Sequence, residues 1–173
     1  DENPPFQRGD TWYNGQTIDA NNLGGEHLLG KVCEFEDLDW DNTTQGAKPM
    51  RTDGKSVKCM AVRNVSGIAL LPKRMVRYQA TAGNYKKRVD GYTVILGDWA
   101  GVVDEWLPIT GVPNNDLFYI TVEGPSNCLT DIDTGANSVI NIGDPLFALT
   151  AATSQATTAG RVFRWNAGMT FSA

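Results

Sequence analysis

Residues 117–124 read LFYITVEG, and this stretch decides the fold class. Apolar side chains occupy every second position and alternate with largely polar ones, Phe118, Ile120 and Val122 against Tyr119, Thr121 and Glu123. A period of two residues is typical of a β-strand, whose successive side chains point to opposite faces of a sheet. We therefore predict a half-buried antiparallel strand, with one face on a core and the other on water or on a partner.

The rest of the chain contains further short runs of β-forming residues, separated by Gly, Asn, Asp or Pro. The candidate strands are residues 55–62, 74–80, 88–96, 99–106, 138–143, 145–149 and 160–165. We find no segment of ten or more residues with convincing helical periodicity and caps. The 18 glycines of the 173 residues supply the positive φ angles that tight β connections need. The spacing predicts an all-β fold, a small antiparallel β-barrel or sandwich.

The first fifty residues are rich in Asn, Gly, Asp and Pro, with short apolar pieces such as HLLG and VCEF. This composition predicts an extended N-terminal arm and loops over residues 1–50, followed by a barrel-like domain over residues 51–173. An arm that orders on docking loses about 1–2 kcal/mol of backbone entropy per residue, so it needs apolar anchors. We expect the partner-binding anchors to be Phe6, Trp12, Tyr13 and Ile18.

Charge is distributed unevenly along the chain. Residues 1–47 carry −8, residues 48–88 carry +10 and residues 89–173 carry −7, for a net charge of −5. The basic segment is either a set of solvated strand faces or a docking surface for an acidic partner. For the docking surface, the candidate residues are Lys73, Arg74 and Arg77. Nucleic acid is a poorer partner, because the whole chain is acidic and its aromatic residues do not interleave with the bases.

The cysteines Cys33, Cys59 and Cys128 form no CxxC motif, and His27 is the single histidine. We therefore expect no metal and no cofactor, and free thiols typical of a reducing compartment, although a Cys33–Cys59 bridge stays open. No apolar run approaches the roughly 20 residues that cross a bilayer. The acidic, Pro-rich start is unlike a signal peptide, so we expect neither export nor a membrane partner.

Residues 133–136 read DTGA, which matches the signature of retropepsin-like aspartic proteases. Such a site needs two aspartates that share a proton, so this chain would have to dimerise. Only forty residues follow Asp133, and they leave no room for a flap hairpin beside the predicted strands. We interpret the motif as a turn and expect no enzyme activity.

Two other short motifs are also interpreted as structural. Arg8-Gly9-Asp10 spells the integrin-binding tripeptide, a match that chance explains. Asp104 and Glu105 are adjacent acids, but on a strand they would point to opposite faces and would not meet one substrate.

The C-terminal half carries four short motifs in a definite order, Gly101-Val102, Val122 to Pro125, Gly143 to Leu146 and Gly160-Arg161-Val162. Over residues 70–165 the chain thereby resembles the capsid decoration, or cement, proteins of tailed bacteriophages. The resemblance implies a non-enzymatic virion protein, made in the host cytoplasm, on the outer capsid surface. It would bridge subunits of the major capsid protein and stabilise the head.

The resemblance further implies homotrimers at threefold or quasi-threefold positions of the capsid. There the basic segment 73–88 would face acids of a neighbouring copy or of the major capsid protein. Removal of residues 1–20 is then expected to weaken capsid binding and to leave the domain folded.

The alternative function is a carbohydrate- or receptor-binding β-domain of a virion fibre or a secreted protein. It would use exposed tryptophans as a stacking platform, from the set Trp12, Trp40, Trp99, Trp106 and Trp165. Tryptophans at strand ends and in arms are more often packing anchors, which favours the first interpretation.

Overall fold

The computed structural model describes, with their side chains, residues 6–11, 25–36, 56–81, 83, 86–92, 99–129 and 160–162. For residues 39–41, 46–48, 146–148 and 163–164 it describes the backbone alone. A single 3-10 turn, η1 (Glu26–Leu28), is the only helical element in these ranges. The strands are β1 (Val32–Glu36), β2 (Asp39–Asp41), β3 (Gly46–Lys48), β4 (Ser56–Asn64), β5 (Met75–Tyr78), β6 (Arg88–Tyr92), β7 (Trp99–Val103), β8 (Leu117–Glu123), β9 (Leu146–Ala148) and β10 (Val162–Arg164).

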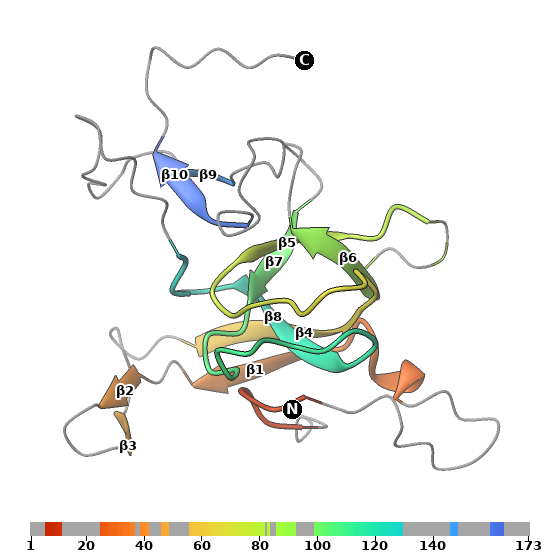
Figure 1. Cartoon of the computed structure of the whole chain (residues 1–173). Helices are drawn as coiled ribbons and strands as arrows, with labels where there is room; N and C mark the ends of the chain where they lie inside the picture. Colours follow the sequence, from red (N-terminus) through yellow and green to blue (C-terminus); the bar gives the residue numbers. More distant parts are fainter. Residues whose placement is uncertain are drawn as a thin grey trace.

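Six strands form one sheet in the order β1-β4-β6-β5-β7-β8, and β8 also pairs with β4. This second pairing closes β4, β6, β5, β7 and β8 into a five-stranded barrel, with β1 added along β4 (Figure 1). All neighbours are antiparallel except β4 and β6, which run parallel through the pairs Arg63↔Arg88 and Asn64↔Val89. The predicted all-β class is confirmed.

The barrel interior holds the apolar face of LFYITVEG. Phe118 and Ile120 are fully buried, and Val122 packs partly buried against the same cluster. They meet valines and other apolar residues of the other barrel strands, among them Val62, Val76, Val89 and Val103. The predicted core face of this strand is therefore confirmed.

The opposite face of β8 is also covered. Tyr119 and Thr121 are both buried, and Tyr119 packs on the outward side chains of β4, Val57, Cys59 and Ala61. Partly buried Phe6, Cys33 and Phe35 lie over this second cluster. Tyr119 is thus covered by the chain's own N-terminal residues, which is neither of the predicted environments, whereas Glu123 on the same face is exposed to water as predicted.

Each of β4 to β10 overlaps a predicted strand, but β7 ends at Val103 where a strand was predicted over residues 99–106, and residues 138–143 lie outside the described ranges. The sequence pattern missed β1, β2 and β3, which were included in the arm. β1 pairs with β4 over five residues, from Val32↔Met60 to Glu36↔Ser56. Residue 50, the predicted start of the domain, therefore falls between two strands of one sheet.

Candidate partner-binding site

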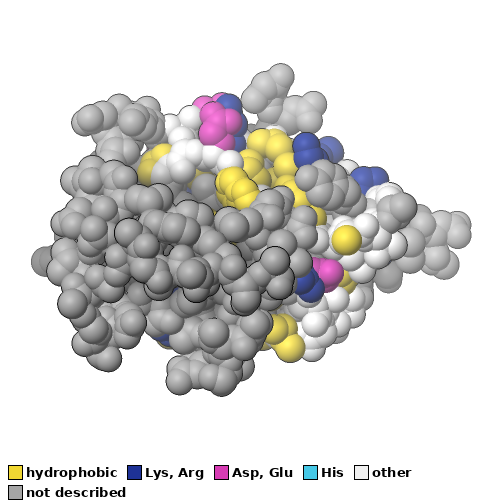
Figure 2. Space-filling model, turned by 90° about the horizontal axis from the view of Figure 1, so that it is seen from above, with side chains coloured by type: hydrophobic (Ala, Val, Ile, Leu, Met, Phe, Trp, Pro, Cys, Tyr) yellow, Lys and Arg dark blue, Asp and Glu magenta, His cyan; other side chains and the backbone are white. Residues whose placement is uncertain are grey.

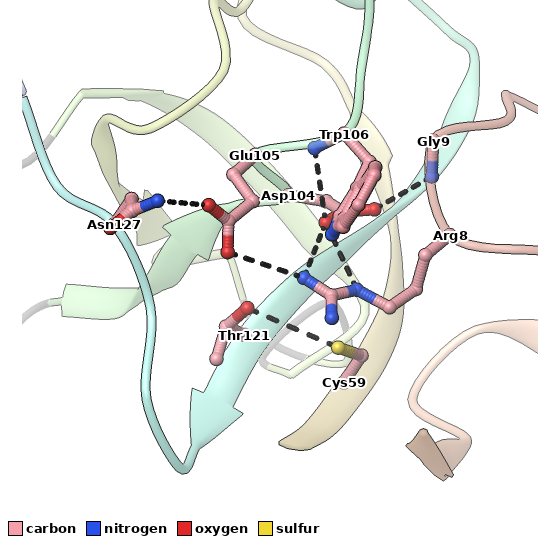
Figure 3. A network of polar contacts seen from close by, with 8 residues as sticks. All are labelled: Arg8, Gly9, Cys59, Asp104, Glu105, Trp106, Thr121 and Asn127. Carbon is pink, nitrogen blue, oxygen red and sulfur yellow. Dashed lines mark hydrogen bonds and ion pairs between the residues drawn. The ribbon is translucent and has the colours of Figure 1, made fainter. Parts of the chain in front are cut away.

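Residues 6–9 fasten the start of the described chain to the barrel, and we call the contacts of Phe6, Arg8 and Gly9 the N-terminal clasp. The Arg8 Nε and Nη2 atoms donate hydrogen bonds of 3.1 and 2.9 Å to Asp104 Oδ1 (Figure 3). The backbone N–H of Gly9 donates to Asp104 Oδ2 at 2.7 Å. Both oxygens of this buried carboxylate are thus bonded to residues close to the chain's start.

Glu105 completes the charge balance around the guanidinium. Its Oε1 lies 3.7 Å from Arg8 Nη2, and its Oε2 accepts a hydrogen bond from Asn127 (Figure 3). The expectation that Asp104 and Glu105 point to opposite faces is wrong, because β7 ends at Val103 and both acids follow the strand. Their shared role is to hold Arg8.

The Arg8-Gly9-Asp10 tripeptide is not displayed as a recognition loop. The Arg8 side chain is 8% exposed and the Asp104 side chain 1% exposed, so the ion pair is buried. A guanidinium held in this way is unavailable to a receptor. The chance interpretation of the motif agrees with this geometry.

Phe6 supplies the apolar part of the clasp. Its ring stacks on Tyr119 with the centroids 4.2 Å apart, and Phe35 meets the same tyrosine edge-on at 5.1 Å. Phe6 was predicted to anchor an arm on a partner, and here it packs on its own barrel. Trp12, Tyr13 and Ile18, the other predicted anchors, lie outside the described residues.

The cluster under Phe6 contains two groups whose ionisation is suppressed. Burial raises the pKa of the Cys59 thiol to about 12, although the nearby Arg8 guanidinium acts in the opposite direction. Burial also raises the pKa of Tyr119, whose hydroxyl donates to Cys33 Sγ at 3.7 Å. Both groups therefore stay protonated to a higher pH than they would in the unfolded chain.

The three predicted basic contact residues have different environments. Arg74 is 5% exposed, and its guanidinium carbon lies 5.3 Å from the centroid of the Tyr92 ring, a cation–π contact inside the protein. Arg77 is partly exposed and its Nε donates to Asp90 Oδ1 at 2.8 Å. Lys73 is partly exposed and precedes β5. Of the three, Lys73 and Arg77 have side chains that a partner can reach.

A second basic group lies at the end of β4, and it joins Lys86, Lys87 and Arg88 of the predicted basic segment 73–88 to Lys31 and Arg63, which the sequence analysis did not select. Glu26 Oε1 lies 3.2 Å from the Nη2 atoms of both Arg63 and Arg88, so one carboxylate faces two guanidinium groups. Lys31, Lys86 and Lys87 are exposed beside this pair. They come together because Gly30 packs against the backbone carbonyl of Lys86 and the side chain of Lys87. We call Lys31, Lys86 and Lys87 the basic rim.

The surface seen in Figure 2 carries mixed chemistry. Hydrophobic side chains form a group there, and Lys and Arg side chains lie around it, some of them against acids.

Some sequence features fall outside the described ranges. They include the DTGA motif, the side chain of Trp40, and Trp165. Trp106 is half-buried, and its backbone N–H lies 3.4 Å from Asp104 Oδ1. Trp99, at the start of β7, is 52% exposed.

Within the described ranges, no group of three or more His, Cys, Asp or Glu residues is placed to hold a metal ion. No helix in that part of the chain has the length and apolarity to cross a membrane. Comparison of the sequence and structure with protein-family models, with curated proteins and with solved structures gave no match.

Proposed function

We propose that this chain is a capsid decoration protein that binds the outside of a viral head and bridges subunits of the major capsid protein. The observation that carries the proposal is the ordered set of four motifs between Gly101 and Val162. The closed barrel supports it, because a protein that acts by adhesion needs a rigid scaffold and an exposed contact surface.

Three of the four motifs contain a glycine where the barrel leaves no room for a side chain. A Cβ on Gly101 would lie 2.4 Å from Thr121 O, and one on Gly124 would lie 2.8 Å from Ser56 O. A Cβ on Gly160 would lie 2.6 Å from a Tyr92 ring carbon. These three glycines are therefore positions that this fold requires, which supports the proposal.

The proposed partner-binding surface contains only residues whose side chains a partner can reach. Lys73 and Arg77 stay in the proposed surface and Arg74 leaves it, because Arg74 is buried. The basic rim is added, since its three lysines are exposed and close together. These groups face acidic patches of the major capsid protein or of a neighbouring copy in a homotrimer.

The N-terminal clasp changes the expected effect of removing residues 1–20. Such a deletion removes Phe6 and Arg8, and so uncovers Tyr119 and leaves Asp104 buried without its cation. We now expect lower stability as well as weaker capsid binding. The proposed role as adhesive anchors accordingly passes from Phe6 to Trp12, Tyr13 and Ile18.

The test is to mix the purified chain with heads that lack it, from the phage that encodes it, and to image the particles by electron microscopy. The proposal predicts density for the barrel on the outer surface, at threefold or quasi-threefold positions. Co-sedimentation with intact heads measures the occupancy. If the chain stays in the supernatant and native particles carry no density for it, decoration is not its function.

A carbohydrate- or receptor-binding role is the second candidate, and the exposure of Trp99 favours it. An indole that is 52% exposed on a barrel strand offers a flat surface on which a sugar ring can stack. A glycan array with the isolated chain separates the two functions. Selective binding that is lost in Trp99→Ala supports this second candidate, and an array without binding removes it.

A further inference from the structure

Cys33 and Cys59 lie directly opposite each other across the β1–β4 pair. They are register partners in an antiparallel ladder, so their side chains point to the same face of the sheet. Both pack in the cluster around Tyr119, and both are free thiols in the structure. The fold therefore places two cysteines that are far apart in the sequence next to each other.

The separation suits a disulfide. Directly opposed residues of antiparallel strands have Cα atoms about 4.5–5.5 Å apart, depending on the hydrogen-bonding position. Disulfides join cysteines whose Cα atoms are about 4.4–6.8 Å apart. A bond between Cys33 and Cys59 thus needs rotation of the side chains and no new pairing of the strands.

The two thiols differ in access. Cys59 is fully buried, and its Sγ lies 3.9 Å from the hydroxyl oxygen of Thr121. Cys33 is partly exposed and accepts the hydrogen bond of the Tyr119 hydroxyl. A reagent from solution therefore meets Cys33 first, and Cys59 reacts only with a neighbour inside the cluster.

We infer that Cys33 and Cys59 form an oxidation site, at which a small-molecule disulfide such as oxidised glutathione converts the two thiols into a cross-strand disulfide. The Cys33 thiolate attacks the small disulfide, breaks its S–S bond and forms a mixed disulfide, and one small thiol leaves. Cys59 Sγ, on losing its proton, then attacks Cys33 Sγ and releases the second small thiol. The protein loses two electrons and two protons, and the reagent gains them as two thiols.

The bond would fasten β1 to the barrel. Within the described residues, β1 pairs only with β4, at the outer edge of the sheet. A disulfide at the middle of this pairing closes the loop of residues 34–58 and restricts the unfolded chain. It forms in any oxidising compartment, whichever partner the chain binds.

The test uses the full-length chain, first reduced and then equilibrated with oxidised and reduced glutathione at several ratios. After an acid quench, thiol titration, intact mass and a non-reducing peptide map are measured. We expect the number of free thiols to fall from three to one, with the loss of two hydrogen atoms and a Cys33–Cys59 cross-linked peptide. The thermal midpoint of the oxidised chain should exceed that of the reduced chain.

Two variants sharpen the experiment. Cys128→Ser should form the same cross-link, since Cys128 lies after β8 and outside the cluster. Cys59→Ser should stop at the mixed disulfide, with glutathione on Cys33. The inference is overturned if the unsubstituted chain keeps glutathione on Cys33 beside a free Cys59 at every ratio, or if its cross-link contains Cys128.

Discussion

Arg8 and Asp104, 96 residues apart in the sequence, share two hydrogen bonds of 3.1 and 2.9 Å beneath the surface. The carboxylate lies directly after β7, and the guanidinium comes from a segment without regular secondary structure. Both side chains are almost fully buried. If one member of the pair is removed, little water can therefore solvate the charge that remains. The start of the described chain is therefore part of the folded barrel.

Substitution of Asp104 by Asn should lower the free energy of unfolding by about 3 kcal/mol, since it removes the charge of the carboxylate that forms two hydrogen bonds with the buried Arg8 guanidinium. Urea denaturation of the two chains measures the difference. Glu105→Gln is the matched comparison, because its Oε1 lies 3.7 Å from Arg8 Nη2, farther than the hydrogen-bonded Asp104 Oδ1 at 2.9 Å. We expect a smaller loss for this variant than for Asp104→Asn, because the longer ion pair is weaker than the two hydrogen bonds. Equal losses in the two variants would contradict the role given to Asp104.

Gly101→Ala should destabilise the chain by about 3 kcal/mol, because the added methyl group meets the backbone oxygen of Thr121 on a central strand. Gly83→Ala is the comparison. Gly83 has a φ of 83° and nothing within 4 Å of an added Cβ, so its cost is the conformational strain of about 1 kcal/mol. Thermal unfolding of both variants shows which one loses more stability. A smaller loss for Gly101→Ala than for Gly83→Ala would show that β7 and β8 can separate.

The sequence predicted the strands that a local alternation of apolar and polar residues specifies. The alternation around Phe118 predicted both the strand and its inner face, because a period of two is set by the backbone itself. β1 carries the same signal, Cys33 and Phe35 alternating with Glu34 and Glu36, and surrounding Asn and Gly residues obscured it. This alternation is typical of a strand over residues 32–36, ahead of the predicted boundary at residue 50.

Contacts between distant segments could not be predicted from the pattern. Tyr119 looked like a residue for water or a partner, since nothing near it in the sequence indicates that Phe6 covers its ring. The basic rim likewise depends on Gly30 lying against Lys86, a packing contact between the turn after η1 and the turn before β6. Such proximities follow from the closed barrel and not from composition.

Stability should decrease at alkaline pH because of Cys59. Its pKa is near 9.0 in the unfolded chain and about 12 in the folded chain, so the unfolded state loses its proton first. The stabilisation is fully present below pH 9 and is lost as the pH rises from about 9 to about 12, by up to about 4 kcal/mol. Urea denaturation at a series of pH values under reducing conditions measures this slope.

Cys59→Ala provides the control for the alkaline transition. The variant should be less stable at pH 7, because it loses a buried sulfur, but its stability should fall less steeply above pH 9. A residual slope is expected from Tyr119, whose pKa burial also raises. An unchanged slope in Cys59→Ala would mean that the thiol ionises equally in the folded and unfolded chains.

Charge reversal in the basic rim tests the proposed contact with an acidic partner. Lys86→Glu should weaken binding to heads about threefold to tenfold at low salt, and by less at high salt, because exposed charges are screened. Lys58→Glu changes the net charge equally, but Lys58 lies elsewhere on the sheet and already pairs with Glu123 at 2.9 Å. Co-sedimentation with heads over a salt series measures both variants. Equal weakening would assign the effect to overall charge, and a loss that salt does not change would assign it to packing, so either result would remove the rim from the binding surface.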